Sequence, residues 1–185
     1  MKYVSGALIA VILLLCGAAI FLYGGRYNVA ATAPHSKITT WILETARDQS
    51  IHFHSRGIQA PSLKDQKLGK DGFKEYHEMC RQCHGAPGQR PAEFAQGLYP
   101  KPPALTSEEI EEFNEGGLYW IVKNGIKMTG MPAFGPTHDE DELWAIVAFL
   151  RNLARMTPKE YDAMAKSAGR AQIEGEHQHR GSRKH

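Results

Sequence analysis

The chain has 185 residues, which is enough for one domain of ordinary size with accessory segments. Hydrophobic residues make up 42% and charged residues 23% of the chain, and these values exclude a chain that is disordered throughout. A net charge of +2 is too small for a dedicated nucleic-acid-binding protein, and three cysteines are too few for a disulfide framework.

The N-terminal segment is long enough and apolar enough to cross a membrane. No charged residue occurs from Val4 to Tyr23, and a helix of that length reaches about 30 Å, the thickness of the hydrocarbon core of a bilayer. We therefore expect residues 1–25 to be a transmembrane anchor. A cleaved signal peptide is the alternative, because a small-residue cleavage pattern occurs at Ala31-Thr32-Ala33. Both interpretations export the rest of the chain.

Residues 26–66 are predicted to form a linker with a juxtamembrane helix. A stretch rich in Gly, Ala and Pro occupies residues 24–35, and Ser36 is a candidate N-cap for the helix that follows. The helix is expected to run from Ser36 to about Arg56 because apolar residues recur at loosely helical spacing. These residues are Ile38, Trp41, Ile42, Ile51 and Phe53.

Residues 67–160 carry nearly all the patterned sequence and predict an all-α domain. Thr106 and Thr137 each begin a pattern typical of a capping box, and Gly116-Gly117 predicts a break in the middle helix. Long Pro- and Gly-rich loops and a small apolar core indicate that the domain packs around something else. The rest of the chain, 161–185, is predicted to be a polar, His-rich tail. The three predicted helices cover residues 71–82, 106–122 with the break at 115–117, and 137–153.

The strongest chemical signal is Cys80-Arg81-Gln82-Cys83-His84, which has the spacing of a c-type haem attachment site. Two thiols three residues apart at a helix end can reach the two vinyl groups of one porphyrin, and His84 then offers an imidazole nitrogen to the iron as proximal ligand. The other ring nitrogen needs an acceptor, and we expect the backbone carbonyl of Pro87 to provide it.

Other roles for the two cysteines are less consistent with the sequence. A thioredoxin-like pair expects a βαβ context, and the sequence shows no strand-like pattern there. A structural zinc site needs a second pair of ligands, and the third cysteine, Cys16, lies in the apolar N-terminal segment. A disulfide between Cys80 and Cys83 is the remaining alternative.

A haem iron has a second axial position, and Met131 is the predicted distal ligand. It lies in Gly130-Met131-Pro132-Ala133-Phe134, a loop segment where a core methionine is unusual. Pro132 stiffens the loop, and Phe134 is placed to pack on the haem face. Met128 is close enough to compete. The remaining candidates are four histidines that we expect at the surface or outside the compact region: His77 and His138, and His52 and His54.

From about Leu68 to Met156 the chain resembles class I monohaem c-type cytochromes, in a membrane-anchored bacterial form. The resemblance implies a class I cytochrome c fold, with three to five helices wrapped around one covalent haem c, and a haem domain on the periplasmic side of the inner membrane. It also implies that Gly72 and Phe73 meet the Trp144–Phe149 face where the first and last helices cross. The resemblance rests on the motif at 80–85, the Tyr119–Ile126 helix and turn, Met131-Pro132-Ala133-Phe134 and the Leu143–Leu150 helix.

Two axial protein ligands leave no open position on the iron, so the sequence favours one-electron transfer over catalysis. We expect a membrane-anchored electron carrier of a respiratory chain, with redox proteins as donor and acceptor and no nucleic-acid partner. Tyr119, Trp120 and Phe134 are candidates for the apolar wall of the haem.

Two alternatives remain. The first is a haem subunit of a larger membrane oxidoreductase complex, which a solvent-exposed apolar face between Ile38 and Phe53 would favour. The second is a haem sensor or enzyme with a labile Met131, which binding of carbon monoxide would favour.

Overall fold

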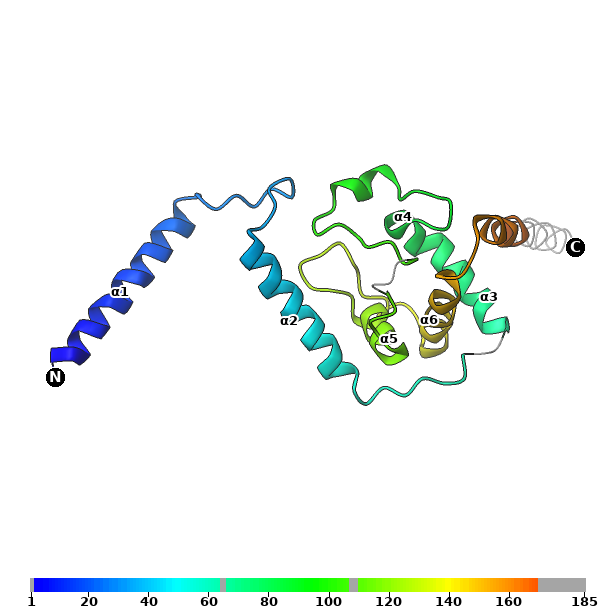
Figure 1. Ribbon diagram of the computed structural model, residues 1–185, viewed down its shortest axis with the longest axis horizontal. Coiled ribbons are helices and arrows are strands. Elements are labelled where there is room, and N and C mark those ends of the chain that lie inside the picture. Colours follow the sequence, from blue (N-terminus) through cyan, green and yellow to red (C-terminus); the bar gives the residue numbers. More distant parts are fainter. Residues whose placement is uncertain (1, 64–65, 107–109, 170–185) are drawn as a thin grey trace, which may run out of the picture. The chain divides into compact units, whose positions relative to one another are not determined.

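The computed structural model describes residues 2–63, 66–106 and 110–169. Across these ranges the regular structure is helical, which confirms the predicted all-α class (Figure 1). The chain divides into two compact units, Met1–Pro34 and His35–His185. Most of the predicted capping box at 106–109 and most of the predicted tail lie outside the described residues.

The first unit contains one long helix, α1 (Lys2–Tyr23). Its window Gly6–Tyr23 has a mean hydropathy of 2.6, and none of that window is buried against the rest of the protein. The helix is therefore long and apolar enough to cross a membrane, as the sequence predicts.

In the second unit, helix α2 (Lys37–Ser55) begins where predicted, because the Ser36 side chain accepts a hydrogen bond from the Thr39 N–H at 3.2 Å. Two histidines of α2 contact the region of α5 (Glu115–Asn124). The ring of His52 lies 5.5 Å from that of Phe113, and the ring of His54 stacks on Trp120 at 5.6 Å. The prediction that these histidines lie outside the compact region is therefore wrong.

The haem-motif segment lies at the end of a continuous helical run that is longer than the predicted 71–82. The run consists of α3 (Gln66–Glu75), a π-helical turn η1 (Tyr76–Cys80) and α4 (Arg81–His84). A π-turn widens the helix locally, and such turns occur frequently at functional sites.

Two helix starts differ from the predicted ones. Helix α6 (Glu140–Leu153) begins at a capping box formed by Asp139 and Glu142, rather than at Thr137. Helix α5 begins at Glu115, because the Asn114 side chain accepts a hydrogen bond from the Gly117 N–H at 2.8 Å. The predicted break at 115–117 is therefore the first turn of α5.

The core forms where α3 packs against α6, which lie side by side in Figure 1. Gly72 allows this contact, since a Cβ at this position would overlap the Ala145 carbonyl and touch Phe149. Next to it, the rings of Phe73 and Phe149 meet edge to face at 5.5 Å. The predicted crossing is confirmed.

The described fold continues past residue 160 in a helix over 158–169. Tyr161 from this helix is fully buried, and its ring meets that of Phe73 at 5.3 Å. The Tyr161 hydroxyl lies 2.9 Å from Nδ1 of His77. Tyr161 therefore belongs to the core rather than to a polar tail, and His77 is half-buried rather than at the surface.

Replacing Gly72 with alanine should lower the free energy of unfolding by about 1–3 kcal/mol, because the added methyl group overpacks the α3–α6 contact. Gly69→Ala is the matched control, since its nearest neighbour would be Asn152 Nδ2 at an ordinary 3.7 Å. The control should stabilise the helix by about 0.5–1 kcal/mol. Thermal unfolding of both variants measures the difference, and equal effects would contradict the assigned packing.

Replacing His77 with glutamine should flatten the dependence of stability on pH. Burial, with a smaller effect from Arg81, lowers the pKa of His77, so the unfolded chain binds the proton more readily. The stability from neutral His77 is complete above about pH 6.5 and is lost as pH falls towards the folded pKa. Thermal midpoints from about pH 8 to about pH 5 measure both slopes. If the thermal midpoints of wild type and variant change equally with pH, His77 is not the source of the pH dependence.

Candidate functional site

The two neighbouring cysteines lie one turn apart at the C-terminal end of the long helical run. Cys80 is buried, Cys83 is half-buried, and both thiols are free. Burial, together with Glu75 and Cys83, raises the pKa of the Cys80 thiol to about 12. Cys80 is therefore a neutral thiol in the hydrophobic core.

The end of this helix is held by hydrogen bonds to the residue after the motif. The Tyr76 hydroxyl donates to the Gly85 carbonyl at 2.7 Å, and the Gly85 N–H donates to the Arg81 carbonyl at 2.8 Å. Burial raises the pKa of Tyr76, which keeps its hydroxyl protonated as a donor. Ala86 and Gln89 then exchange a pair of backbone hydrogen bonds that closes a tight turn. The backbone of His84 is therefore held between the helix that precedes it and the turn that follows it.

The His84 ring is oriented by a more distant carbonyl than predicted. Its Nδ1 lies 2.8 Å from the Pro103 carbonyl oxygen, so Pro87 as the acceptor was wrong. Pro87 is instead buried in the turn between Ala86 and Gln89. A carbonyl only accepts, so Nδ1 carries the proton and Nε2 keeps its lone pair for a ligand. Burial lowers the pKa of His84, while the bond to Pro103 acts in the opposite direction.

Backbone hydrogen bonds on both sides of Met131 hold the predicted distal-ligand loop. The Ile126 N–H donates to the Met131 carbonyl at 3.2 Å, and the Met131 N–H donates to the Thr129 hydroxyl at 3.1 Å. The loop passes so close to Gly125 that a Cβ there would lie 2.7 Å from the Met131 carbonyl oxygen. Met131 is half-buried, whereas Met128 is 92% exposed.

One segment contacts both the His84 side and the Met131 side of the candidate site. Pro103 accepts the hydrogen bond from His84, and Leu98, five residues earlier, packs against Gly130 next to Met131. The structure therefore places the loop of Met131 and the ring of His84 around the same stretch of chain, Leu98–Pro103.

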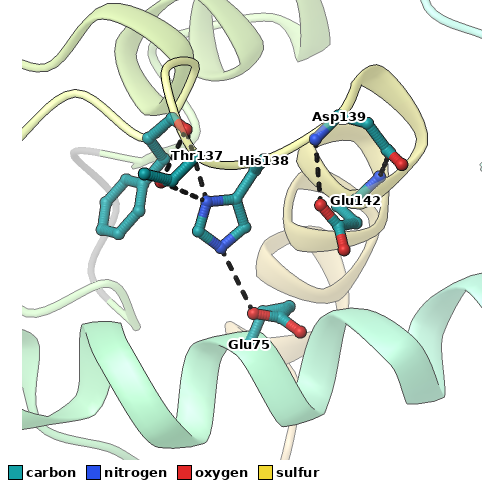
Figure 2. A network of polar contacts seen from close by, with 6 residues as sticks. Glu75, Thr137, His138, Asp139 and Glu142 are labelled. Atoms are coloured by element: carbon teal, nitrogen blue, oxygen red, sulfur yellow. Dashed lines mark hydrogen bonds and ion pairs between the residues drawn. The ribbon is translucent and has the colours of Figure 1, made fainter.

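A polar network ties the loop that follows Met131 to α3 (Figure 2). His138 Nε2 lies 3.4 Å from the Glu75 carboxylate, and His138 Nδ1 lies 2.9 Å from the Thr137 hydroxyl. The Phe134 carbonyl accepts hydrogen bonds from the N–H groups of Thr137 and His138, both at 3.0 Å. With its side chain only 13% exposed, His138 is not the surface residue that the sequence predicts. No sequence pattern pairs it with Glu75.

The three predicted wall aromatics each have a ring contact within the protein. Tyr119 stacks on Trp144 at 4.3 Å, and Trp120 stacks on His54 at 5.6 Å. Phe134 is half-buried, and its ring meets that of His138 at 5.5 Å. Only Phe134 belongs to the loop that carries Met131.

The donor groups fit a prosthetic group that brings most of the iron ligands itself. Among the described residues, no three His, Cys, Asp or Glu side chains converge as a protein-only metal site. What the chain offers is two free thiols at porphyrin-attachment spacing and one imidazole with Nε2 open. These residues fit a covalently attached haem, in which the porphyrin supplies four nitrogens to the iron.

Comparison with known proteins agrees with this geometry. The family model for cytochrome c oxidase, cbb3-type, subunit III matches residues 54–150, which is more than half of the chain. No curated protein matches the chain. The matched range includes the cysteine motif, Met131 and the crossing of α3 with α6, in a helical fold consistent with class I cytochromes c. The chain therefore belongs to the c-type cytochrome family described by that model, and its domain carries covalent haem c for electron transfer.

Proposed function

We propose that this protein is a membrane-anchored monohaem cytochrome c that carries single electrons in a periplasmic respiratory chain. The observation that carries the proposal is the hydrogen bond from His84 Nδ1 to the Pro103 carbonyl. It orients an imidazole one residue after two free thiols and leaves Nε2 available, as a proximal iron ligand requires.

In this proposal Cys80 and Cys83 hold the haem through two thioether bonds, and His84 is the proximal ligand. The buried helix end supports these roles, because the Tyr76–Gly85 hydrogen bond prevents the motif from unwinding. Pro103 keeps the imidazole in one tautomer and one orientation, which keeps Nε2 directed at the iron.

Met131 is the proposed distal ligand. Its backbone is hydrogen-bonded at both N–H and carbonyl, and the same segment that holds His84 packs against its loop. Met128, the competing methionine, is almost fully exposed and has a positive φ of 61°. A half-buried methionine whose backbone is held by hydrogen bonds is a better candidate ligand than an exposed one.

When bound, the haem supplies a one-electron Fe(III)/Fe(II) couple. A methionine ligand raises the reduction potential, and apolar surroundings contribute in the same direction. In our proposal Phe134 excludes water near Met131, while the ring stacking of Tyr119 and Trp120 makes their contribution to the wall indirect. His84 and Met131 would together hold the iron of the bound haem, and such a ligand pair would favour electron transfer over chemistry on an iron-bound substrate.

The proposed location is the inner membrane, with α1 as a single-pass anchor and the haem domain in the periplasm. The length and hydropathy of α1 support the anchor. The resemblance to bacterial c-type cytochromes implies the periplasmic side, because thioether attachment of haem in bacteria takes place outside the cytoplasmic membrane. A tethered carrier searches for its partners in two dimensions at the membrane surface.

The second candidate function is a haem subunit of a larger membrane oxidoreductase complex. The description of the matching family, which names a subunit of an oxidase, favours it. The exposed apolar residues of α2, such as Trp41 at 66% exposure, also indicate that something covers this helix. Co-purification in mild detergent separates the two candidates: a carrier elutes alone, and a subunit elutes with its complex.

Replacing Met131 with alanine should abolish the sulfur–iron charge-transfer band of the oxidised protein and lower the reduction potential. Met128→Ala is the matched control and should leave both unchanged. Absorption spectroscopy and redox titration measure these effects. Loss of the band in the Met128 variant would assign the ligand to that residue. Binding of carbon monoxide by the reduced wild type at neutral pH would instead favour the sensor alternative.

Replacing Cys83 with alanine should leave haem attached through one thioether bond. Replacing both Cys83 and Cys80 should leave haem without a covalent bond, so that acidified organic solvent extracts it. Cys16→Ala is the matched control, because this third cysteine lies in α1, and its haem should stay covalently attached. The absorption of the pyridine complex reports the number of thioether bonds. Haem that resists extraction from the double variant would disprove attachment at these positions.

A further inference from the structure

Helix α2 exposes its apolar side chains. Ile38, Trp41, Ile42 and Phe53 are 71%, 66%, 51% and 62% exposed. A helix on the surface of a soluble domain normally turns its apolar stripe towards the core. The exposed residues of α2 are therefore arranged for an apolar neighbour outside the domain.

These side chains belong to one stripe, which we call the outer stripe. Ile42, Thr45, Gln49 and Phe53 follow Ile38 at intervals of three or four residues, and Trp41 lies three residues after Ile38, so all share one side of a helix with 3.6 residues per turn. None of them is Asp, Glu, Lys or Arg, and all are exposed. The outer stripe consists of Ile38, Trp41, Ile42, Thr45, Gln49 and Phe53.

The residues of α2 that do face the domain ahead of Ile51 are polar. The half-buried positions between 37 and 50 are Thr39, Thr40, Asp48 and Ser50. Residues 41–47 are exposed on every side of the helix, so the apolar side chains there lie in solvent, and the few partly covered positions ahead of Ile51 are polar.

Both ends of α2 are fixed to the domain, so the exposure is a property of the docked helix. At its start, the His35 N–H donates to the Tyr99 hydroxyl at 2.8 Å, and the two rings meet at 5.1 Å. At its end, Ile51 and Ser55 are buried. Turning the outer stripe inwards would break the contacts at both ends.

We propose that the outer stripe of α2 lies in the interface of the lipid bilayer, as a second membrane contact of the haem domain. The inference rests on α1 being the membrane anchor. Thirteen residues separate Tyr23, the end of α1, from Lys37, the start of α2. At about 3.5 Å per residue, that connection keeps the start of α2 within about 50 Å of the end of the anchor. The bilayer is therefore the apolar surface always within reach.

The composition of the stripe specifies the kind of lipid surface. Tryptophan is enriched at the headgroup level of membranes, and isoleucine and phenylalanine insert into the acyl boundary. Because the outer stripe has no basic residue, binding rests on apolar burial. It should therefore occur on neutral phosphatidylcholine and require no anionic lipid.

Spin labelling of the full-length haem protein in phosphatidylcholine liposomes tests this. A nitroxide on Ile42→Cys, in a Cys16→Ala background, reports access to oxygen, which is enriched in lipid, and to a water-soluble nickel chelate. The matched control is Arg47→Cys, an exposed position of α2 outside the stripe. We expect loss of contact with nickel at position 42 and full contact at 47. Gln49→Cys repeats the measurement at a polar position of the stripe, where a label leaves the packing intact.

Nickel access at 42 equal to that at 47 would overturn the proposal, and so would spin–spin broadening at 42, which would place a second copy of the chain on the stripe. Co-flotation of the protein with the liposomes and its haem absorption are read from the same sample. If the protein does not float with the liposomes, both the membrane anchor and this inference are contradicted. If the protein floats and has normal haem absorption but the label at position 42 is exposed to water, only this inference is contradicted.

Discussion

The arrangement of the candidate site depends on the hydrogen bond between His84 Nδ1 and the Pro103 carbonyl. An imidazole on the last turn of a helix can rotate about two bonds, and only a partner outside the helix fixes its plane. Pro103 provides that partner from a segment that also packs Leu98 against Gly130. The orientation of the His84 ring and the position of the Met131 loop are therefore set by the same piece of chain, which has little regular structure of its own.

The rigid support for this site is the helical run that ends at His84. Its first part crosses α6 through Gly72, and its last part carries the two cysteines. The π-turn between these parts changes the direction in which side chains leave the helix, so that Tyr76 stays in the core and reaches the Gly85 carbonyl. The same helical run that packs closely against α6 therefore also holds the cysteine motif in place.

Local signals in the sequence predicted more of the site than of its supports. The cysteine spacing and the Gly/Pro loop around Met131 are readable because their chemistry lies in neighbouring residues. Pro103 was missed because a backbone carbonyl has no side-chain signature. Asp139 was not predicted as the N-cap of α6 because Thr137, two residues earlier, begins a similar capping pattern. Asn114 was not predicted as the N-cap of α5 because the glycines of its first turn, Gly116 and Gly117, are typical of a helix break. Contacts between distant segments, such as Glu75 with His138, depend on the fold itself.

The exposed apolar residues of α2 show that hydrophobic periodicity predicted this helix but not the surface that its apolar side meets. Periodicity identifies the apolar side of a helix but not what that side meets, and in a soluble domain the core is the usual answer. Here His52 and His54, with the buried residues Ile51 and Ser55, hold the end of α2 against the region of α5, and its apolar residues before position 48 stay exposed. An apolar side that faces outwards gains free energy when a second apolar phase removes it from water. In our proposal that phase is the bilayer, which α1 as an anchor keeps within reach of α2.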